Sequence, residues 1–520
     1  MPKTFKIGTR GSLLATTQCG FIKNQLEEIS DYKFELETIS TQGDENTQAP
    51  LWQLDGKDFF TKELDEALLT GKVDLVVHSY KDLGSERPEG IHLGAITERK
   101  YPHDILLLKK KTAQSLIAGN FNNDQFIVGT SSPRRIFNIT KKLKQFIPSK
   151  KELAIETKDL RGNVNTRIQK LLDGNYDAIV LAFAGLERLA NEQSSKEVLE
   201  ELIKDLNFSV LPLSEFPCAA AQGALAIEYG KNLESNSELV EIINKLNHSN
   251  TIEEVSLERK SFLSFGGGCH LAVGISVKKC GDFKAEYLSG TCDDQIINEK
   301  NEIRTVNTRA PKTERPFIGV PPHRPRPSMK NYVYDELIDK RIIDNKNKIT
   351  SSNIYVTSSY VIDALKNIEK QNPFVWTAGS STWKKVLENG FWVNGCSDSC
   401  GEEELNKLLN SELIKTFTKS TEVISLTSNE ASFNIGEIYP TYEKVKCPYP
   451  EQYKEKILKA KVFYWTSYNQ YEDFIKEFPE IIDEVHCCGI GKTLKQFQDK
   501  NIDVIPFISI DNFETWVFNN

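Results

Sequence analysis

Short apolar runs alternate with helical patterns along the chain, and this alternation restricts the fold more than any other feature of the sequence. Runs typical of buried strands lie at 5–9, 73–78, 126–129 and 178–182, and segments with helical spacing lie at 12–29, 164–172 and 256–262. Strands that alternate with helices pack into layers, with helices covering the sheet. The sequence therefore predicts an α/β protein, in which polar loops at strand ends lead into helix N-termini that favour anions.

The chain is too long for one hydrophobic core, because 520 residues exceed the usual size of a single domain. Prolines cluster among charged and amide side chains at 307–349, which is typical of a linker. Beyond it, YVTS at 355–358 leads to a glycine turn at 379–382, and YWTS at 464–467 leads to one at 489–493. We expect two similar α/β halves there, with chance similarity as the alternative.

The composition excludes several classes of protein. The formal net charge is -8, which argues against a nucleic-acid partner. No apolar run is long enough for a membrane span, and the N-terminal residues have no apolar signal core, so a cytoplasmic protein without a membrane partner is expected. Ten cysteines lack the spacing of a disulfide scaffold or a structural zinc site, so we expect ordinary thiols and no metal.

Arginines concentrate near several loops of this acidic chain. They are Arg10, Arg134, Arg135, Arg161, Arg167 and Arg188. Because a planar guanidinium binds a carboxylate through two hydrogen bonds, arginines grouped at loops indicate a site for a small polyanion. For any single arginine, a surface ion pair is the alternative.

Short motifs follow one another in a characteristic order in the first three hundred residues. The most distinctive are KDFFTKEL at 57–64, VHSYKD at 77–82 and GTSSPRR at 129–135. The others are IGTRGS at 7–12, TQGD at 41–44, LRGNVNTR at 160–167, AGLERL at 184–189, AQGA at 221–224 and GGC at 267–269. In sequence and order, residues 3 to 306 resemble the porphobilinogen deaminase (hydroxymethylbilane synthase) family. KDFF at 57–60 and Leu83-Gly84 depart from the usual pattern but leave the charged groups unchanged.

The resemblance implies a transferase of porphyrin and heme biosynthesis, which joins four porphobilinogen molecules into a linear tetrapyrrole with release of ammonia. It also implies a hinged domain pair like that of type 2 periplasmic binding proteins, plus a small α+β domain that carries the cofactor. The expected division is domain 1 at 1–100 and 200–222, domain 2 at 101–199, and domain 3 at 223–306. A monomer is expected.

By the same resemblance, a dipyrromethane cofactor is attached through Cys269, whose thiolate is the nucleophilic form and which follows three glycines. The residues expected to bind the cofactor are Lys81, Thr130, Ser131, Ser132, Arg134, Arg135 and Arg167. Those expected to bind the substrate or the growing chain are Arg10, Ser12, Lys62, Arg161, Arg167 and Arg188. No role is assigned to His270.

Asp82 resembles the catalytic aspartate of the family. Loss of ammonia from porphobilinogen leaves an electron-poor centre, and a carboxylate can both stabilise positive charge and accept a proton there. A helix or strand cap is the alternative reading for an aspartate taken alone. Within the VHSYKD motif we expect the catalytic role.

A second set of motifs lies in the expected two-lobed region at 350–520. GSST at 379–382, IYPT at 438–441, YWTS at 464–467 and GIGKTLK at 489–495 resemble the uroporphyrinogen-III synthase family, a lyase that closes the linear tetrapyrrole and inverts its last ring. The resemblance implies a multifunctional enzyme with a catalytic Tyr439. The hydroxyls expected to bind its substrate are those of Thr382, Thr466, Ser467 and Thr493.

Two departures keep other readings of this region open. The second glycine turn is one residue shorter than the first, and the opening strand-helix unit is not recognisable before Ser351. A deaminase with a degenerate C-terminal scaffold lobe is therefore one alternative, and helix capping would explain Thr382 and Thr493 equally well. A non-catalytic anion-binding protein with the same hinged fold is a further alternative.

Overall fold

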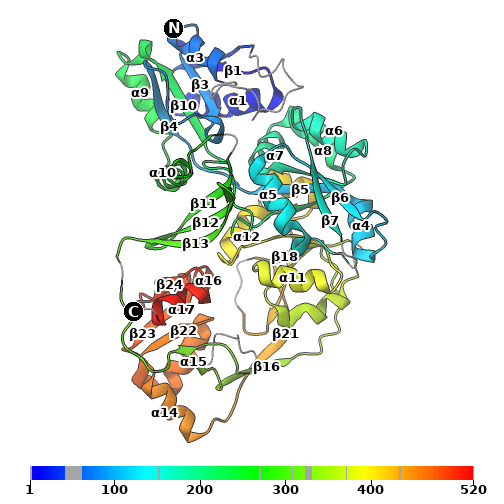
Figure 1. Ribbon diagram of the computed structural model, residues 1–520, viewed down its shortest axis with the longest axis vertical. Helices are drawn as coiled ribbons and strands as arrows, with labels where there is room; N and C mark the ends of the chain where they lie inside the picture. The colour runs from blue at the N-terminus through cyan, green and yellow to red at the C-terminus, as the bar shows by residue number, and fades with distance from the viewer. Residues whose placement is uncertain are drawn as a thin grey trace.

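The computed structural model describes residues 3–40, 61–149, 153–268, 271–306, 308–322, 331–369, 372–431 and 435–518. Within these residues the strands form five sheets, most of them flanked by helices, along an elongated molecule (Figure 1). The N-terminal sheet lies at one end, and the C-terminal third occupies the other. The predicted α/β fold is confirmed. Cys269, His270 and the motifs at 41–44 and 57–60 lie outside the described residues.

The first sheet has the order β2-β1-β3-β10-β4. Its strands are β2 (Lys33–Thr38), β1 (Thr4–Thr9), β3 (Leu75–Ser79), β10 (Leu225–Gly230) and β4 (Ile91–Ile96). β10 runs antiparallel to both of its neighbours, whereas β1 is parallel to β2 and β3. The α-helices described in this domain are α1 (Leu13–Glu28), α3 (Lys62–Leu69) and α9 (Ser237–Asn244).

The second sheet repeats this arrangement with the order β7-β6-β8-β5-β9. Its strands are β7 (Ala154–Lys158), β6 (Gln125–Gly129), β8 (Ala178–Ala182), β5 (Asp104–Lys109) and β9 (Leu206–Val210). Here β5 is the antiparallel strand. The helices are α4 (Lys110–Ala118), α5 (Pro133–Lys142), α6 (Val164–Leu172), α7 (Phe183–Asn191) and α8 (Gln193–Ile203).

The chain crosses between these two sheets twice, at 97–103 and at 211–224. This topology corrects the expected boundaries near 200 and 222. β9 pairs with β5 in the second sheet, although 200–222 was expected in domain 1. β10 pairs with β3 in the first sheet, although 223–306 was expected in domain 3. Residue patterns mark a strand, but they do not specify which sheet it joins, because that depends on pairing with distant residues.

A small α+β unit follows. Helix α10 (Ser249–Ser264) packs against an antiparallel sheet of β11 (Ala272–Cys280), β12 (Phe283–Cys292) and β13 (Gln295–Arg304). Between helix and sheet, Gly266, Gly267 and Gly268 have φ of 95°, 65° and 98°. Three successive residues in this left-handed region require glycine, because a Cβ would be strained at each. These glycines lead the chain directly to the predicted attachment residue.

The C-terminal third forms two lobes (Figure 1). The first has the strand order β16-β21-β20-β17-β18-β19, from β16 (Ile338–Ile342), β21 (Glu437–Lys446), β20 (Val423–Ser428), β17 (Asn353–Val356), β18 (Phe374–Thr377) and β19 (Val393–Cys396). Its α-helices are α11 (Ser380–Glu388), α12 (Glu402–Leu409) and α13 (Glu412–Thr418). Only β16 is antiparallel to its neighbour.

The second lobe has the parallel order β15-β14-β22-β23-β24, from β15 (Val333–Tyr334), β14 (Phe317–Ile318), β22 (Val462–Trp465), β23 (Val485–Gly489) and β24 (Ile505–Phe507). Its α-helices are α14 (Glu451–Lys459), α15 (Tyr468–Glu477), α16 (Lys492–Asp499) and α17 (Ile510–Phe518). β14, β15 and β16 lie within the expected linker at 307–349, so much of that segment is part of the lobes.

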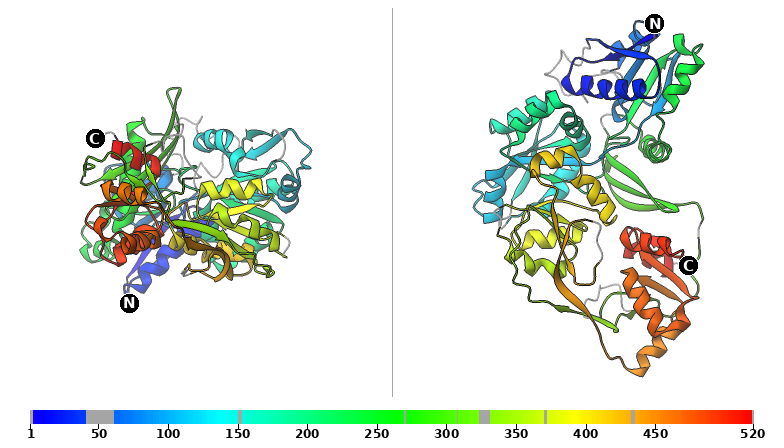
Figure 2. Two further views of the ribbon diagram at one scale, coloured as in Figure 1. Left: turned by 90° about the horizontal axis from the view of Figure 1, so that it is seen from below. Right: turned by 180° about the vertical axis from the view of Figure 1, so that it is seen from behind.

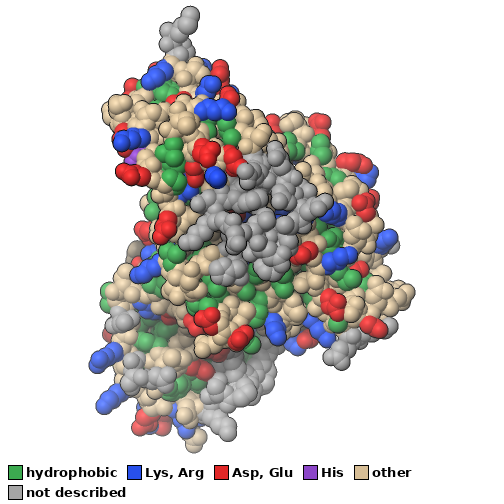
Figure 3. Space-filling view, turned by 45° about the horizontal axis from the view of Figure 1, so that its top comes forward, with side chains coloured by type: hydrophobic (Ala, Val, Ile, Leu, Met, Phe, Trp, Pro, Cys, Tyr) green, Lys and Arg blue, Asp and Glu red, His purple; other side chains and the backbone are tan. Residues whose placement is uncertain are grey.

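One face of the molecule carries mixed charge. On the face in Figure 3, basic and acidic side chains are interspersed and do not gather into one basic area. Among the described residues, no helix is both long and apolar enough to cross a membrane. The second sheet and the first C-terminal lobe lie side by side in Figure 1 and in the right view of Figure 2, and they share hydrophobic clusters.

Candidate active site

A cavity of about 930 Å³ lies between the first and second sheets. Its walls include the N-terminal ends of α1, α6 and α7 and the turn η2 (Tyr80–Asp82). The predicted site residues that line it are Arg10, Ser12, Lys81, Asp82, Arg135, Arg161, Arg167 and Arg188. The tertiary structure therefore brings arginines from separate motifs into one cavity, as the polyanion hypothesis requires.

Two of these arginines hydrogen-bond to backbone carbonyl groups. The Nε of Arg167 donates to the Gly162 carbonyl oxygen at 2.7 Å, and Nη2 of Arg188 donates to that of Gly223 at 2.9 Å. Burial, with repulsion from neighbouring arginines, lowers the pKa of Arg167 to about 10. Burial also lowers the pKa of Arg188 to about 10, against the attraction of Asp82. Both stay cationic at neutral pH, so a carboxylate-bearing ligand would relieve their desolvation.

Asp82 ends the turn η2 and its side chain is exposed in the cavity wall. Arg259 of α10 holds this turn, because its guanidinium donates to the carbonyl oxygens of Tyr80, Leu83 and Gly84 at 3.3, 3.0 and 2.9 Å. Its Cζ also lies 4.6 Å from the Tyr80 ring centroid. Arg259 was not among the predicted site residues, since no local sequence pattern connects it with a turn that lies far away in the chain.

Lys81 lines the cavity beside Asp82. Its Nζ is 3.5 Å from the Gln222 Oε1 atom. Burial lowers the pKa of Lys81, and nearby Asp82 opposes this shift. A carboxylate ligand would stabilise the ammonium in the same way.

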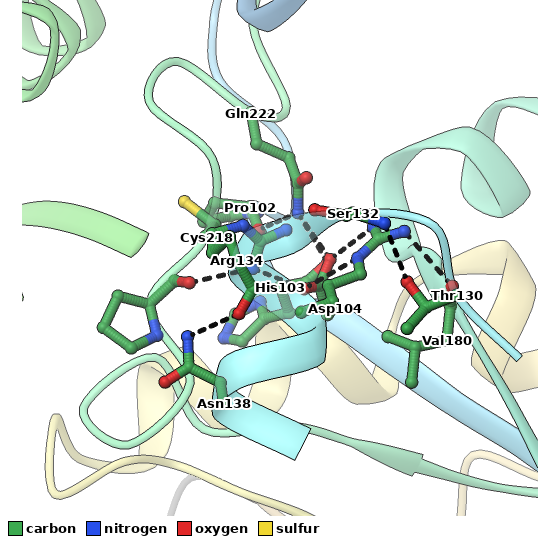
Figure 4. A network of polar contacts seen from close by, with 12 residues as sticks. Pro102, His103, Asp104, Thr130, Ser132, Arg134, Asn138, Val180, Cys218 and Gln222 are labelled. Atoms are coloured by element: carbon green, nitrogen blue, oxygen red, sulfur yellow. Dashed lines mark hydrogen bonds and ion pairs between the residues drawn. The ribbon is translucent and has the colours of Figure 1, made fainter. Parts of the chain in front are cut away.

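Arg134 and Arg135 are neighbours in sequence but differ in their contacts. Arg134 belongs to a network of polar contacts around Asp104 (Figure 4). Arg134 Nη1 donates to Asp104 Oδ2 at 2.7 Å and to the Pro217 carbonyl oxygen at 2.9 Å, and Arg134 is only 5% exposed. Arg135 also binds Asp104, but it reaches the cavity wall. The structure therefore does not favour Arg134 as the cofactor ligand that was predicted, because its guanidinium is bonded inside the protein.

Asp104 is the centre of this network. Its oxygens accept hydrogen bonds from both arginines, and the Nε2 of Gln222 donates to Oδ1 at 3.0 Å. Burial alone would raise the pKa of Asp104, but Arg134 and Arg135 lower it well below the ordinary range. Asp104 was not among the predicted site residues, because an aspartate at the start of a strand forms no recognisable motif.

Four further predicted residues lie outside the cavity wall. The Ser131 hydroxyl donates to the Leu160 carbonyl oxygen and accepts from the Leu160 N–H, both at 3.0 Å. The Thr130 hydroxyl accepts from the Ser132 N–H at 3.3 Å. These bonds shape the loop that positions α5. Lys62 is the exposed first residue of α3, whose neighbour Thr61 does line the cavity.

Buried groups with metal-ligand chemistry lie beside the cavity, and one of them, His78, lines it. Among the described residues they are Asp65, His78 and Glu228. The guanidinium of Arg87 binds both carboxylates, with Nε 2.7 Å from Glu228 Oε1 and Nη2 2.5 Å from Asp65 Oδ1. We interpret the cluster as a structural ion-pair network, since Arg87 already supplies the positive charge that a cation would bring.

Some of the hydroxyls predicted to bind substrate in the C-terminal lobes lie close together, and others do not. Thr493 donates to the Thr466 carbonyl oxygen at 3.4 Å, and Thr466 Oγ1 donates to that of Gly319 at 2.9 Å. Ser467 caps α15 by accepting from the Gln470 N–H at 3.3 Å. Thr382 lies in α11 of the other lobe.

The two glycine turns of these lobes meet at Ser399. A Cβ added to Gly379 would lie 2.7 Å from Ser399 Oγ, and one added to Gly491 would lie 2.6 Å from the Ser399 carbonyl oxygen. These glycines are the N-caps of α11 and α16. Helix capping therefore does not explain Thr382 or Thr493.

Tyr439 has a different environment from the one predicted. It is 7% exposed within a hydrophobic cluster that the first lobe shares with the second domain. Its hydroxyl lies 2.9 Å from the Asn345 carbonyl oxygen and 2.7 Å from that of Asn347, and it accepts from Asn367 Nδ2 at 3.0 Å. The predicted catalytic role is not supported, because these bonds use the hydroxyl within the core.

Comparisons with known proteins agree with the motifs of the first part. Residues 5–238 match the family model "Porphobilinogen deaminase, dipyromethane cofactor binding domain". Porphobilinogen deaminase of Nitratiruptor sp. is 38% identical over 297 residues, which cover 56% of this chain and 86% of that protein. The protein of the same name from Lachnospira eligens is 39% identical over 296 residues, covering 56% and 90%.

Similarity to solved structures is low. Uroporphyrinogen-III synthetase from Helicobacter pylori has 16% identity and a TM-score of 0.27, covering 38% of this chain and 95% of that one. This similarity is too low to establish a common fold or activity.

The dipyrromethane cofactor expected from the sequence is confirmed by the family model, which describes its binding domain. The cavity fits such a group, because Lys81, Arg135 and Arg167 offer cations to its carboxylates. Cys269 lies outside the described residues and stays the predicted attachment point. On the strength of these relatives and the family model, the chain belongs to the porphobilinogen deaminase family.

Proposed function

We propose that residues 3–306 catalyse the head-to-tail condensation of porphobilinogen into a linear tetrapyrrole, with release of ammonia. The observation that supports this most is the cluster of cationic side chains around Asp82 in one cavity between two domains. Each porphobilinogen carries an acetate and a propionate, so a four-ring product has eight carboxylates. Several fixed cations are therefore needed to hold it.

Each group in the cavity has a distinct task in this proposal. Lys81, Arg135 and Arg167 hold carboxylates of the dipyrromethane, which when bound supplies the terminal ring to which substrate is added. Arg10, Ser12, Arg161 and Arg188 hold the incoming substrate or the growing chain. The Asp82 carboxylate stabilises positive charge on the substrate and accepts the proton that leaves the pyrrole. Arg259 keeps Asp82 in position by binding the carbonyls of its turn.

The two crossings between the first and second sheets support a hinged pair like type 2 periplasmic binding proteins. In this proposal the first domain contains 3–96 and 225–246, the second contains 104–210, and the unit at 249–306 presents the cofactor. A monomer in the cytoplasm stays a prediction.

Intact mass spectrometry under denaturing conditions tests the deaminase proposal. We expect the purified chain to carry the mass of one dipyrromethane. Brief exposure to porphobilinogen should add a ladder of pyrrole increments while ammonia is released. A chain that carries the increment but neither extends it nor releases ammonia would contradict the activity, and it would favour the anion-binding alternative.

For the C-terminal lobes we propose uroporphyrinogen-III synthase activity as a second function. The supporting observation is that glycine turns from two α/β lobes meet at Ser399, with the hydroxyls of Thr466 and Thr493 beside the second turn. Backbone N–H groups and hydroxyls at helix starts can bind carboxylates of a tetrapyrrole. Tyr439 has no part in this proposal. A scaffold lobe without activity is the alternative.

The isomer of the product distinguishes synthase activity from an inactive scaffold lobe. Incubated with porphobilinogen, the full chain should give mainly the type III macrocycle, because free linear product cyclises to type I without ring inversion. Thr493→Val should shift the product toward type I, whereas Thr515→Val, which removes an exposed hydroxyl on α17, should not. Type I product from the unmodified chain would contradict the synthase activity and favour the scaffold. An unchanged Thr493→Val product would exclude only that hydroxyl.

A further inference from the structure

The first C-terminal lobe is packed directly onto the second deaminase domain. Phe146 and Trp383 meet edge to face with ring centroids 5.5 Å apart, and Trp383 Nε1 donates to the Phe146 carbonyl oxygen at 3.2 Å. Residues of both regions share two hydrophobic clusters of buried side chains. Close-packed side chains transmit displacement, so the lobe and the domain should behave as one body.

Polar bonds join the edges of two sheets at this contact. β9 is the last strand of the second sheet, and β19 is the last strand of the lobe's sheet. Ser209 Oγ donates to the Val393 carbonyl oxygen at 2.7 Å, while Trp392 Nε1 and Asn394 Nδ2 both donate to that of Phe208 at 2.9 Å. These bonds are buried, and each edge covers the other. The contact is therefore specific as well as hydrophobic.

Glu187 of α7, the residue before the cavity-lining Arg188, also links the domain to the lobe. Its carboxylate accepts from the backbone N–H groups of Glu412 at 3.1 Å and Leu413 at 2.9 Å, which open α13 in the lobe. Asn191 Nδ2 also donates to it, at 2.9 Å, and Glu187 is only 7% exposed. First-turn N–H groups lack partners within their own helix, so a carboxylate there is well stabilised.

The same helix borders the cavity. Arg188, the next residue, lines it and bonds to the Gly223 carbonyl oxygen. A Cβ added to Gly185 would lie 3.5 Å from Leu14 of α1, the helix that begins beside Arg10 and Ser12. Helix α7 thus lies between the C-terminal lobe and the cavity, in contact with both.

We propose that Glu187 is a positioning residue of the deaminase. By capping α13 it fixes α7 against the C-terminal lobe and so holds Arg188 in the place where it meets substrate carboxylates. The lobe is therefore a structural part of the deaminase site, whatever its own activity. This inference rests on the proposed condensation of porphobilinogen.

The test uses the full chain and approaches the contact from both sides. Glu187→Ala removes the acceptor, whereas Glu187→Gln keeps a neutral acceptor oxygen. On the lobe side, Glu412→Pro removes one N–H donor. Proline suits the first position of a helix, and Ser411 before it already has φ -65° and ψ 144°. Glu412→Ala is the matched control, because it keeps the N–H and removes only the side chain, whose partly exposed ion pair with Lys196 of α8 contributes little.

We expect Glu187→Ala to raise the KM for porphobilinogen about tenfold with a much smaller change in kcat. Glu187→Gln should recover most of this loss, Glu412→Pro should raise KM in the same direction, and Glu412→Ala should leave it unchanged. Cofactor content by mass should stay at the wild-type level in all four variants. Hydrogen exchange at the start of α13 should be faster in Glu187→Ala and Glu412→Pro.

Two results would overturn the proposal. One is faster exchange at α13 with an unchanged KM, since the cap would then serve the lobe alone. The other is an equal loss in all four variants, or a parallel loss of cofactor and kcat, since that would indicate general disruption. If the unmodified chain does not consume porphobilinogen, it is the proposed function that fails, and exchange still reports whether Glu187 caps α13.

Discussion

The guanidinium of Arg135 and the carboxylate of Asp104 form a two-point pair, with Nη2 2.7 Å from Oδ1 and Nε 3.1 Å from Oδ2. Asp104 begins β5, immediately after the first crossing between the two deaminase domains. Arg135 also reaches the cavity, whereas Arg134 binds Asp104 from inside the protein. The pair therefore fixes one cavity cation to the strand on which the second domain begins.

Arg134→Leu should lower stability and should not act on cofactor binding directly. Removing one partner of a buried ion pair leaves Asp104 less compensated, and we expect a loss of about 3 kcal/mol in the free energy of unfolding. Denaturant titration measures it. Arg341→Leu is the control, because Arg341 is 71% exposed and its pair with Glu443 contributes little. Unchanged stability together with a missing dipyrromethane would instead make Arg134 a cofactor ligand.

The contribution of Asp104 should depend on pH. Its pKa is lowered in the folded chain from an ordinary value of 3.8, so its charge stabilises the fold above that value. The stabilisation is lost progressively as pH falls below about 4, because the unfolded chain then binds the proton more readily. Comparing the unfolding free energies of the wild type and Asp104→Asn between about pH 7 and pH 3 checks this. The difference should shrink below pH 4, and a constant difference would contradict the role of the charge.

Asp82→Asn should keep the fold and the cofactor but lower turnover by about 10²-fold, because the amide cannot stabilise positive charge or accept a proton. Steady-state release of ammonia, with cofactor content by mass, is the measurement. Glu86→Gln is the matched control, since Glu86 is an exposed carboxylate in the same loop. Turnover close to wild type in Asp82→Asn would remove this residue from the mechanism.

Arg161→Leu should leave the dipyrromethane attached and weaken chain extension. A lost charge-assisted contact with a substrate carboxylate corresponds to roughly 1.5 to 3 kcal/mol, or about ten- to a hundredfold in KM. Mass spectra after brief exposure to porphobilinogen should show shorter ladders than wild type. Arg135→Leu should instead reduce attachment of the cofactor itself, so identical ladders from the two variants would contradict the division of roles.

Cys269→Ser should give folded protein without the dipyrromethane mass and without tetrapyrrole synthesis, because a hydroxyl is a poorer nucleophile than a thiolate. Cys292→Ser is the control, as this partly exposed thiol of the same unit should be dispensable. The measurement is the intact mass of each variant, which shows whether the dipyrromethane is attached. If Cys269→Ser still carried the dipyrromethane increment, the attachment point would have to be another residue.

The sequence determined the local features of this protein. Alternating apolar and helical patterns predicted the α/β layers, and neighbouring residues of one short turn, such as Lys81 and Asp82, were recognised as a motif. The glycines at 266–268 also reflect a local requirement, since only glycine adopts three successive left-handed conformations without strain. Such features depend on the backbone conformation and on side chains that are close to one another in the sequence.

Tertiary structure alone decided which distant groups meet. Arg134 and Arg135 share a motif, yet only Arg135 reaches the cavity wall. Tyr439 was expected to be catalytic, and its hydroxyl is bonded within a core. β9 and β10 pair in other sheets than the expected domain boundaries implied. The Glu187 carboxylate accepts a hydrogen bond from the N–H of Leu413, which is 226 residues away in the C-terminal lobe. The physical reason is that periodicity reports which face of an element is buried, whereas the group that covers that face is chosen by long-range packing.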